Sequence, residues 1–174
     1  MTLEKVIRHP EKIFWPQDEY SKLDLAQYYE AVFPKLQPYV NGRLLTMERC
    51  PDGMQGECFY QKSAPHGLPS STPTKVIRHA NRDVRYVVGG SIETQLALVN
   101  LGCIPVHIWA SRASHERQPD WIVFDLDPPS EAFAAAARAG MLVKEALDQL
   151  KLASFPKTSG SRGLHVFVPL RVGP

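Results

Sequence analysis

The chain has 174 residues, of which 44% are hydrophobic and 22% charged, so it can fold around a hydrophobic core of its own. Its net charge of +2 permits contact with nucleic acid without requiring it. No apolar run approaches the roughly 18 residues that cross a bilayer. Charged residues also stand near the N-terminus where a signal peptide would be apolar. We therefore expect a cytoplasmic protein with no membrane partner.

The cysteines predict the same compartment. Cys50, Cys58 and Cys103 are odd in number and lack the spacing of metal ligands. We therefore expect all of them to be reduced thiols, as in a cytosol.

The first 120 residues predict a module of helices and strands. Ser21, with Asp24 after it, resembles a capping box, and apolar residues at helical spacing predict a helix over residues 21–36 that Pro38 ends. Ser91 predicts the start of a second helix, which Gly102 stops. The predicted strands cover residues 44–47, 57–61, 76–77, 85–88 and 103–109, with a turn at 51–53 and a loop at 63–74.

The most informative stretch is the apolar run that begins at Trp121 and ends in Asp125 and Asp127. The apolar run predicts a buried strand, and Pro128 and Pro129 predict that it cannot continue past Asp127. The two aspartates would share one face, roughly 6.5 Å apart along the strand. A divalent cation relieves the repulsion between such carboxylates, and Mg²⁺ is often held by one or two carboxylates plus substrate phosphates. The stretch predicts a metal site; the alternative is two solvated aspartates in a strand-to-helix turn.

The remainder predicts one helix and two strands. The helix is expected to start at Ser130, with Glu131 in its first turn, and to end near Leu150. Strands are predicted at residues 152–157 and 164–170, joined by a turn at 159–163. The order β–α–β–turn–β indicates an α/β or α+β fold.

The turn between these two strands offers groups that bind phosphate. Residues 158–165 read Thr-Ser-Gly-Ser-Arg-Gly-Leu-His, which supplies exposed N–H groups, hydroxyls and a guanidinium. Glycine- and serine-rich hairpins are common, so the turn alone is a weak signal. Because it follows the Asp-x-Asp strand by one helix, phosphate binding is the favoured interpretation. His165 opens the next strand and alternates with Val166, so we expect it to face the same cleft as the carboxylates.

These segments resemble a known family. Residues 124–128 (Phe-Asp-Leu-Asp-Pro) and 158–165 are similar to motifs I and II of archaeo-eukaryotic primase-type polymerases. The likeness is strongest to the polymerase domain of bacterial DNA ligase D and its archaeal relatives, which serve non-homologous end joining. It extends in chain order through residues 12–16, 22–24, 49–53, 59–62 and 106–109.

The resemblance implies an α/β (α+β) fold with mixed β-sheets flanked by helices and an RRM-like β-α-β-β catalytic half. Residues 1–174 would form one primase-polymerase-type domain, with an N-terminal module at 1–120 and the motif I and II segment at 121–174. The implied activity is a metal-dependent nucleotidyl transfer that adds ribonucleotides or deoxynucleotides to 3′-ends.

The resemblance also implies roles near the reaction. Asp125 and Asp127 would be catalytic and would hold two Mg²⁺ or Mn²⁺ ions that clamp the 3′-hydroxyl and the triphosphate. The residues that would contact the incoming NTP or dNTP are Ser159, Gly160, Arg162, His165 and His107. His107 has a simpler interpretation as a satisfied polar residue.

Further roles concern DNA. Lys12 and Lys22 match lysines that grip a 5′-phosphate, although they could be solvated surface charges. Phe59 and Tyr60 match an aromatic pair that stacks on the template; because they alternate along a strand, one of them is expected in the core. The implied partners are DNA with 5′-phosphorylated ends, a DNA ligase domain and Ku, at the nucleoid.

One departure concerns the metal. The family places a third catalytic aspartate well beyond motif II, whereas this sequence ends at Pro174. We therefore expect the chain alone to bind DNA ends but to extend primers slowly or not at all. A third ligand, if present, would be sought first at Glu116, Asp120 or Asp148.

Two other classes of function compete. One is a non-catalytic module that binds 5′-phosphorylated DNA ends. The other is a haloacid-dehalogenase-type phosphatase, which also has an Asp-x-Asp strand. The phosphatase is disfavoured, because its motif lies near the N-terminus and places Thr or Val where this chain has Pro129.

Overall fold

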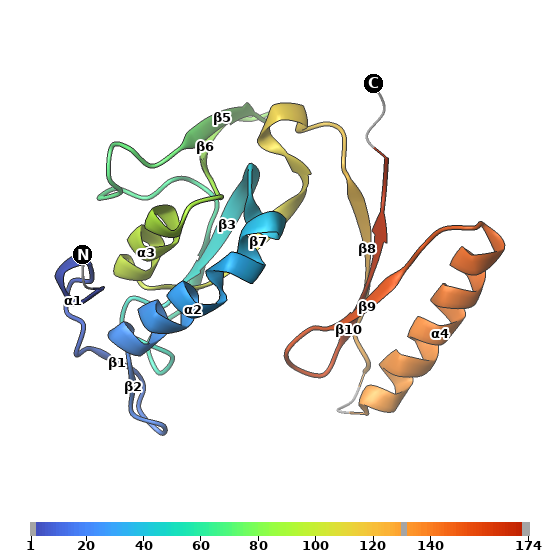
Figure 1. Cartoon of the computed structure of the whole chain (residues 1–174), viewed down its shortest axis with the longest axis horizontal. Helices are drawn as coiled ribbons and strands as arrows, with labels where there is room; N and C mark the ends of the chain where they lie inside the picture. Colours follow the sequence, from blue (N-terminus) through green and yellow to red (C-terminus); the bar gives the residue numbers. More distant parts are fainter. Residues whose placement is uncertain (1–2, 130–131, 172–174) are drawn as a thin grey trace. The chain divides into compact units, whose positions relative to one another are not determined.

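The computed structural model describes residues 3–129 and 132–171 and divides into two compact units, Met1–Ser114 and His115–Pro174 (Figure 1). Each unit combines antiparallel strands with helices and has hydrophobic clusters of its own. In the described ranges, no helix is both long enough and apolar enough to cross a membrane.

The first unit is built on a five-stranded antiparallel sheet. Its strands are β3 (Arg43–Arg49), β4 (Phe59–Gln61), β5 (Thr74–Arg78), β6 (Asp83–Val88) and β7 (Cys103–Arg112). They run in the order β4-β3-β6-β5, and β7 also pairs with β3. β3 therefore lies at the centre, and its residues Leu44, Leu45 and Met47 are fully buried.

Three helices and a short hairpin form the second layer of this unit. The elements are α1 (Leu3–Val6), the hairpin of β1 (Ile13–Trp15) and β2 (Tyr20–Ser21), α2 (Lys22–Val40) and α3 (Ile92–Asn100). Leu25, Ala26 and Tyr29 of α2 pack with Leu96 and Val99 of α3 in one hydrophobic cluster. A 3₁₀ turn, η1 (Ala113–His115), follows β7.

The start of α2 is as predicted, but its end is not. Ser21 is the N-cap, and the reciprocal bonds with Asp24 form the expected capping box. The helix does not stop at Pro38; it continues to Val40 with Pro34 and Pro38 inside it. Proline removes helical hydrogen bonds, yet buried Phe33 and Val40 hold this last stretch against the core.

The other predicted elements of the first unit are confirmed with small shifts in their bounds. The strands at 44–47, 57–61, 76–77, 85–88 and 103–109 correspond to β3 to β7. Ser91 caps α3 as expected, and Gly102 follows the helix with a φ of 74°, a conformation that glycine favours.

The expectation of three reduced cysteines is wrong. Cys50 and Cys58 form a disulfide, and only Cys103 is a free, buried thiol. The turn between β3 and β4 brings the two Cα atoms to 4.3 Å, which an odd cysteine count does not reveal. Burial raises the pKa of the Cys103 thiol to about 12, so it stays protonated and unreactive.

The second unit has the predicted β-α-β-β order. Its elements are β8 (Trp121–Leu126), α4 (Phe133–Gln149), β9 (Phe155–Thr158) and β10 (Leu164–Pro169). β10 lies in the middle of the sheet and is antiparallel to both neighbours. Helix α4 covers one face, where Leu147 packs on Val166 and Val168.

The structure of the second unit differs from the prediction at β8. β8 is not a buried strand: Ile122 is 43%, Val123 38% and Phe124 37% exposed. It lies at the edge of a three-stranded sheet with one helix on one face, so burial on both faces is not provided within the unit. Ser130 and Glu131, the expected helix start, lie outside the described residues.

Candidate functional site

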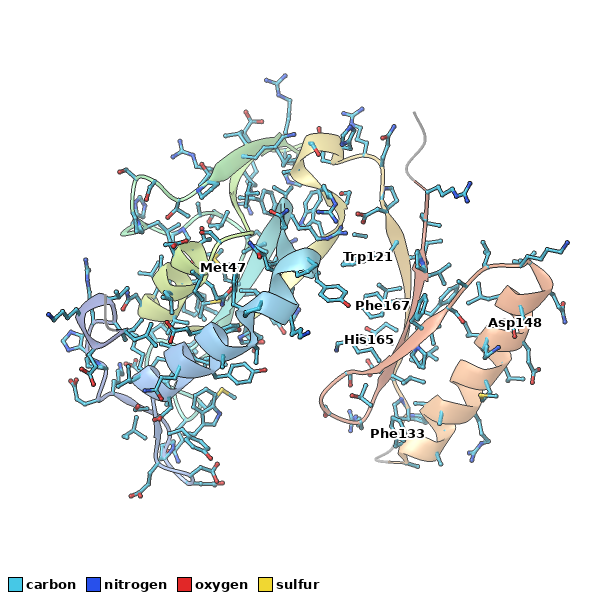
Figure 2. All side chains as sticks on the ribbon, in the orientation of Figure 1. Met47, Trp121, Phe133, Asp148, His165 and Phe167 are labelled. Carbon is cyan, nitrogen blue, oxygen red and sulfur yellow. A yellow bond between two sulfur atoms is a disulfide. The ribbon has the colours of Figure 1, made fainter. Side chains whose placement is uncertain are left out.

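The carboxylate of Asp125 meets His165 across two paired strands. The register of β8 with β10 places the two residues opposite each other, and the His165 Nε2–Asp125 Oδ1 distance is 3.3 Å. Asp125 is largely exposed, whereas His165 is partly buried. Figure 2 shows His165 with Trp121 and Phe167 on the side of the sheet away from α4. The open face of this sheet therefore carries a histidine–carboxylate contact beside two aromatic rings, which lie edge to face at 5.6 Å.

Asp127 follows β8 directly and lies against the turn that joins β9 to β10. A Cβ built on Gly163 would be 2.5 Å from Asp127 Oδ1 and 3.1 Å from Ser159 Oγ. Real Cβ atoms do not approach other atoms so closely, so glycine is what lets the backbone pass beside the carboxylate. The chain thus brings Asp127 and the predicted phosphate-binding turn together.

Hydrogen bonds within the turn fix its shape. Ser159 Oγ accepts from Gly163 N at 3.0 Å and from Ser161 N at 3.4 Å, and Ser159 N donates to Gly163 O at 3.1 Å. Gly160 has a φ of 101°, where a side chain would be strained. A hydroxyl that accepts two N–H groups still has its own hydrogen to donate. Ser159 can therefore donate to an anion from an ordered position.

Arg162 lies at an open cavity of about 570 Å³ beside the same turn. Phe133, Thr158 and Ser161 are the other lining residues, and Figure 2 shows Phe133 at the first turn of α4. The exposed guanidinium adds a charged donor to the hydroxyls. Sequence reasoning did not single out Phe133 or assign a role to Thr158. For Phe133, the signal that could have been used is an apolar residue at the start of the predicted helix.

His107 lies in the first unit, on β7. Its ring is 5.4 Å from that of Tyr60, and its Nε2 is 3.8 Å from Glu48 Oε2. It is an exposed histidine with an aromatic and an acidic neighbour, and neither neighbour was predicted. Pairing of Thr46 with His107 and of Glu48 with Tyr60 on the two sides of β3 produces this group.

Phe59 and Tyr60 are both exposed, so the expectation that one of them belongs to the core is wrong. β4 is a three-residue strand at the end of the sheet order, where these two consecutive side chains stay exposed. Arg49, opposite Phe59 in the register, places its guanidinium 5.4 Å from the Phe59 ring centroid. Sequence reasoning gave Arg49 no role; counting the hairpin register back from the turn would have found it.

Lys22 is buried, contrary to the alternative that it is a solvated surface charge. Its Nζ donates to Arg8 O and Asn100 O, each at 2.9 Å. Burial lowers its pKa, and the nearby charges of Lys12 and Arg8 lower it further. An ammonium group has three donors, so one N–H of Lys22 remains beyond these two bonds.

Lys12 lies close to Lys22 and is partly exposed. Its Nζ forms an ion pair with Asp52 Oδ1 at 2.8 Å, and Lys22 N donates to Lys12 O at 2.8 Å. The structure therefore brings the two predicted lysines together and adds Arg8 and Asp52, for which the sequence gave no signal beyond their charge.

Comparison with known proteins decides the family. A family model described as "LigD, primase-polymerase domain" matches residues 21–174. The chain belongs to this family. The resemblance of the two motif segments is thereby confirmed.

Named relatives agree with the LigD assignment. The chain is 32% identical to a multifunctional non-homologous end joining protein LigD of Pseudomonas aeruginosa, covering 94% of this chain and 20% of that protein. It is 31% identical to a bifunctional LigD of Bacillus subtilis, covering 97% of this chain and 29% of that protein. The chain therefore spans less than a third of the length of these relatives.

A solved structure confirms the fold. The polymerase domain from Mycobacterium tuberculosis ligase D, in complex with DNA, superposes with a TM-score of 0.87 at 26% identity. The match covers 94% of this chain and 60% of that one. The mixed α/β architecture expected from the sequence is that of the LigD polymerase domain.

The LigD-type carboxylates fit a cation in part. Asp125 and Asp127 are exposed carboxylates two residues apart, near the end of β8 and directly after it, which suits Mg²⁺ held by one or two carboxylates plus phosphates. Within residues 3–129 and 132–171, no group of three or more His, Cys, Asp or Glu could hold a metal. Asp148 pairs with Lys144 on α4, which covers the opposite face from Asp125. Neither Asp148 nor the other expected candidates, Glu116 and Asp120, completes such a group.

Gly163→Ala tests the contact between this LigD turn and Asp127. The added methyl would displace the Asp127 carboxylate, and we expect Mn²⁺ affinity to fall by about tenfold, as when groups that orient a metal ligand are changed. Calorimetric titration with Mn²⁺ measures the effect, with urea denaturation as a check on folding. Ser161→Ala, an exposed position in the same turn, is the control. Equal affinity in the two variants would contradict the proposed contact.

Proposed function

We propose that this chain carries the metal- and nucleotide-binding segment of a nucleotidyltransferase in non-homologous end joining. The activity is that of a primase-type DNA/RNA polymerase that adds nucleotides to 3′-ends at breaks or gaps with a 5′-phosphate. The observation that supports it most is the position of Asp127 against the Ser159–Gly163 turn. The names of the relatives, end joining proteins and a polymerase domain with DNA, support the same class of reaction.

Asp125 and Asp127 would hold the Mg²⁺ or Mn²⁺ ions, two in this family, which neutralise phosphate charge and promote attack by a 3′-hydroxyl. His165 contributes by orienting Asp125. Its Nε2 lies 3.3 Å from Asp125 Oδ1, and a contact at that distance would limit rotation of the carboxylate. The exposed face of Asp125 is then available for a cation.

The turn would bind the triphosphate of an NTP or dNTP. Ser159 donates its hydroxyl hydrogen, Gly160 allows close approach of a phosphate to the backbone, and Arg162 supplies charge and a planar pair of donors. His107, exposed beside Tyr60, is proposed as a further nucleotide contact.

The first unit would hold a DNA end. Lys22, with one N–H left over from its two carbonyl partners, and Lys12 would grip the 5′-phosphate. Arg8 adds charge near the same place. A phosphate would compete with Asp52 for Lys12, so this contact is expected to be sensitive to salt.

Phe59 and Tyr60 would stack on template bases at a gap or end. Both rings are exposed, and stacking on aromatic faces tolerates any base. The guanidinium of Arg49, held by Leu101 O at 2.9 Å and Gln61 Oε1 at 2.7 Å, supports the Phe59 ring. A DNA ligase domain and Ku are the protein partners that we propose, in the cytoplasm at the nucleoid.

A non-catalytic module for 5′-phosphorylated DNA ends is the second candidate. It is favoured by the described residues, which include no third carboxylate near Asp125 and Asp127. Such a module would use the lysines and the exposed aromatic pair without nucleotide addition.

Asp125→Asn tests the polymerase proposal. We expect primer extension on gapped, 5′-phosphorylated DNA with Mn²⁺ and NTPs to fall by about 100-fold or more, because a misplaced reactant costs that much rate. DNA affinity should stay the same or rise slightly, because a negative charge is lost. Asp148→Asn, on the opposite side of the second unit, is the matched control and should extend at the rate of the unmodified chain.

The same assay separates the two candidates. Extension by the unmodified chain that requires Asp125 supports the polymerase. Tight binding of the 5′-phosphorylated end with no extension by any variant supports the binding module. Extension that Asp125→Asn leaves unchanged would contradict the assigned catalytic role.

Lys12→Ala tests recognition of the DNA end. We expect the preference for a 5′-phosphate over a 5′-hydroxyl end to shrink. The slope of log affinity against log salt concentration should fall in magnitude by about one, as for the loss of one phosphate contact. Fluorescence anisotropy at several salt concentrations measures both quantities. Lys35→Ala removes an exposed lysine of α2 as the control. An undiminished preference in Lys12→Ala would place the phosphate elsewhere.

A further inference from the structure

The first unit contains a cavity of about 600 Å³ to which none of the roles above assigns a ligand. Its walls come from the β1–β2 hairpin, the start of α2, the end of β3 and the start of β7. None of the residues proposed to contact metal, nucleotide or DNA lines it. This volume is within the range of ligand-binding pockets.

Aromatic side chains form much of the wall: Trp15, Tyr20, Tyr28 and Tyr29. The Tyr29 side chain is held in place, because its hydroxyl donates to Ile104 O. Burial raises the pKa of this hydroxyl, so it stays protonated. Tyr28 meets Tyr29 edge to face at 5.6 Å. Tyr20 and Tyr28 are more than half exposed, so ring surface is available to a ligand.

Two carboxylates also line the cavity, Asp24 and Glu48. Ser21 N and Ser21 Oγ both donate to Asp24 Oδ2, at 2.7 and 2.6 Å, so Oδ1 can accept from a ligand. These bonds lower the pKa of Asp24, which is therefore ionised at neutral pH. Asp24 and Tyr28 are four residues apart on α2, which places a charge and a ring on one helix face.

Positive charge is missing from this wall, since its described lining residues include no lysine or arginine. The chain as a whole has a net charge of +2, so the cavity differs in sign from the rest of the protein. Glu48 Oε2 lies 3.8 Å from His107 Nε2. The site therefore attracts cations and repels phosphate.

The wall that carries Met54 is held in place before any ligand binds. The Cys50–Cys58 disulfide closes the turn, and Met54 N donates to Phe14 O at 2.8 Å. Gly53 packs so closely that a Cβ would be 3.0 Å from Phe14 Cα. A wall that is already ordered loses little conformational freedom on binding.

We propose that this cavity binds an arginine side chain, presented between apolar residues by a segment of a partner protein. A guanidinium is planar, so it can stack on an exposed tyrosine while its N–H groups reach a carboxylate. Asp24 Oδ1 and Glu48 are the carboxylates, Tyr20 and Tyr28 supply the rings, and Met54 receives an apolar neighbour.

A nucleobase would also stack on these rings, but its phosphate would enter a cavity with two carboxylates and no lining lysine or arginine among the described residues. Charge therefore selects a basic peptide over DNA or a nucleotide. The proposal is independent of the polymerase function, because it uses none of the residues assigned to that reaction.

The probe is the peptide Ac-Ala-Leu-Arg-Leu-Ala-NH₂, with a twin that carries citrulline in place of arginine. Citrulline keeps the shape of the side chain and removes its charge. In ¹⁵N-resolved NMR titrations of the full chain, we expect shifts at Tyr28, Met54 and Glu48. The citrulline twin should bind at least about tenfold more weakly.

Tyr28→Ala and Tyr39→Ala form a matched pair, since both tyrosines lie on α2 and are 59% exposed, while only Tyr28 lines the cavity. Tyr28→Ala and Glu48→Gln should each weaken binding of the arginine peptide about tenfold, and Tyr39→Ala should not. Equal binding of the two peptides, no binding of either, or equal loss in both tyrosine variants would overturn the proposal. So would thymidine monophosphate producing the same shifts in place of the peptide.

Discussion

The antiparallel pairing of β8 with β10 determines which groups meet at the candidate metal site. It places His165 opposite Asp125, and it brings Gly163 to the position beside Asp127. A shift of one residue would turn both carboxylates to the face that α4 covers. The buried side chains of Leu164, Val166 and Val168 on that face resist such a shift. The hydrophobic contact with α4 therefore holds the polar face in register.

Backbone carbonyls at helix ends accept hydrogen bonds from several cationic side chains of the first unit. Lys22 binds Asn100 O and Arg49 binds Leu101 O at the end of α3, while Arg43 binds Tyr39 O in the last turn of α2. The C-terminal end of a helix carries partial negative charge, which favours these contacts. These three cations therefore hold the fold together. The proposed phosphate contacts use the donors that remain, on Lys12 and on the third N–H of Lys22.

The sequence was sufficient for the motifs and elements whose signals are local. Proline after Asp127, glycine in the 159–163 turn and Ser21 before α2 each act within a few residues, and each is found as predicted. The errors concern pairing and burial, which depend on distant residues. The Cys50–Cys58 bridge, the burial of Lys22 and the exposure of Phe59 and β8 follow from the tertiary arrangement. The contacts of Arg49 and the aromatic cavity have the same origin.

We propose that Asp125 and Asp127 form one cation site beside the Ser159–Gly163 turn. Anomalous diffraction from crystals that contain Mn²⁺ and a nucleoside triphosphate tests it most directly. The account predicts a Mn²⁺ peak within about 2.0–2.6 Å of an oxygen of each carboxylate. It also predicts phosphate oxygens in contact with Ser159 and Arg162. A Mn²⁺ ion bound elsewhere, or a triphosphate that does not touch this turn, would contradict the account.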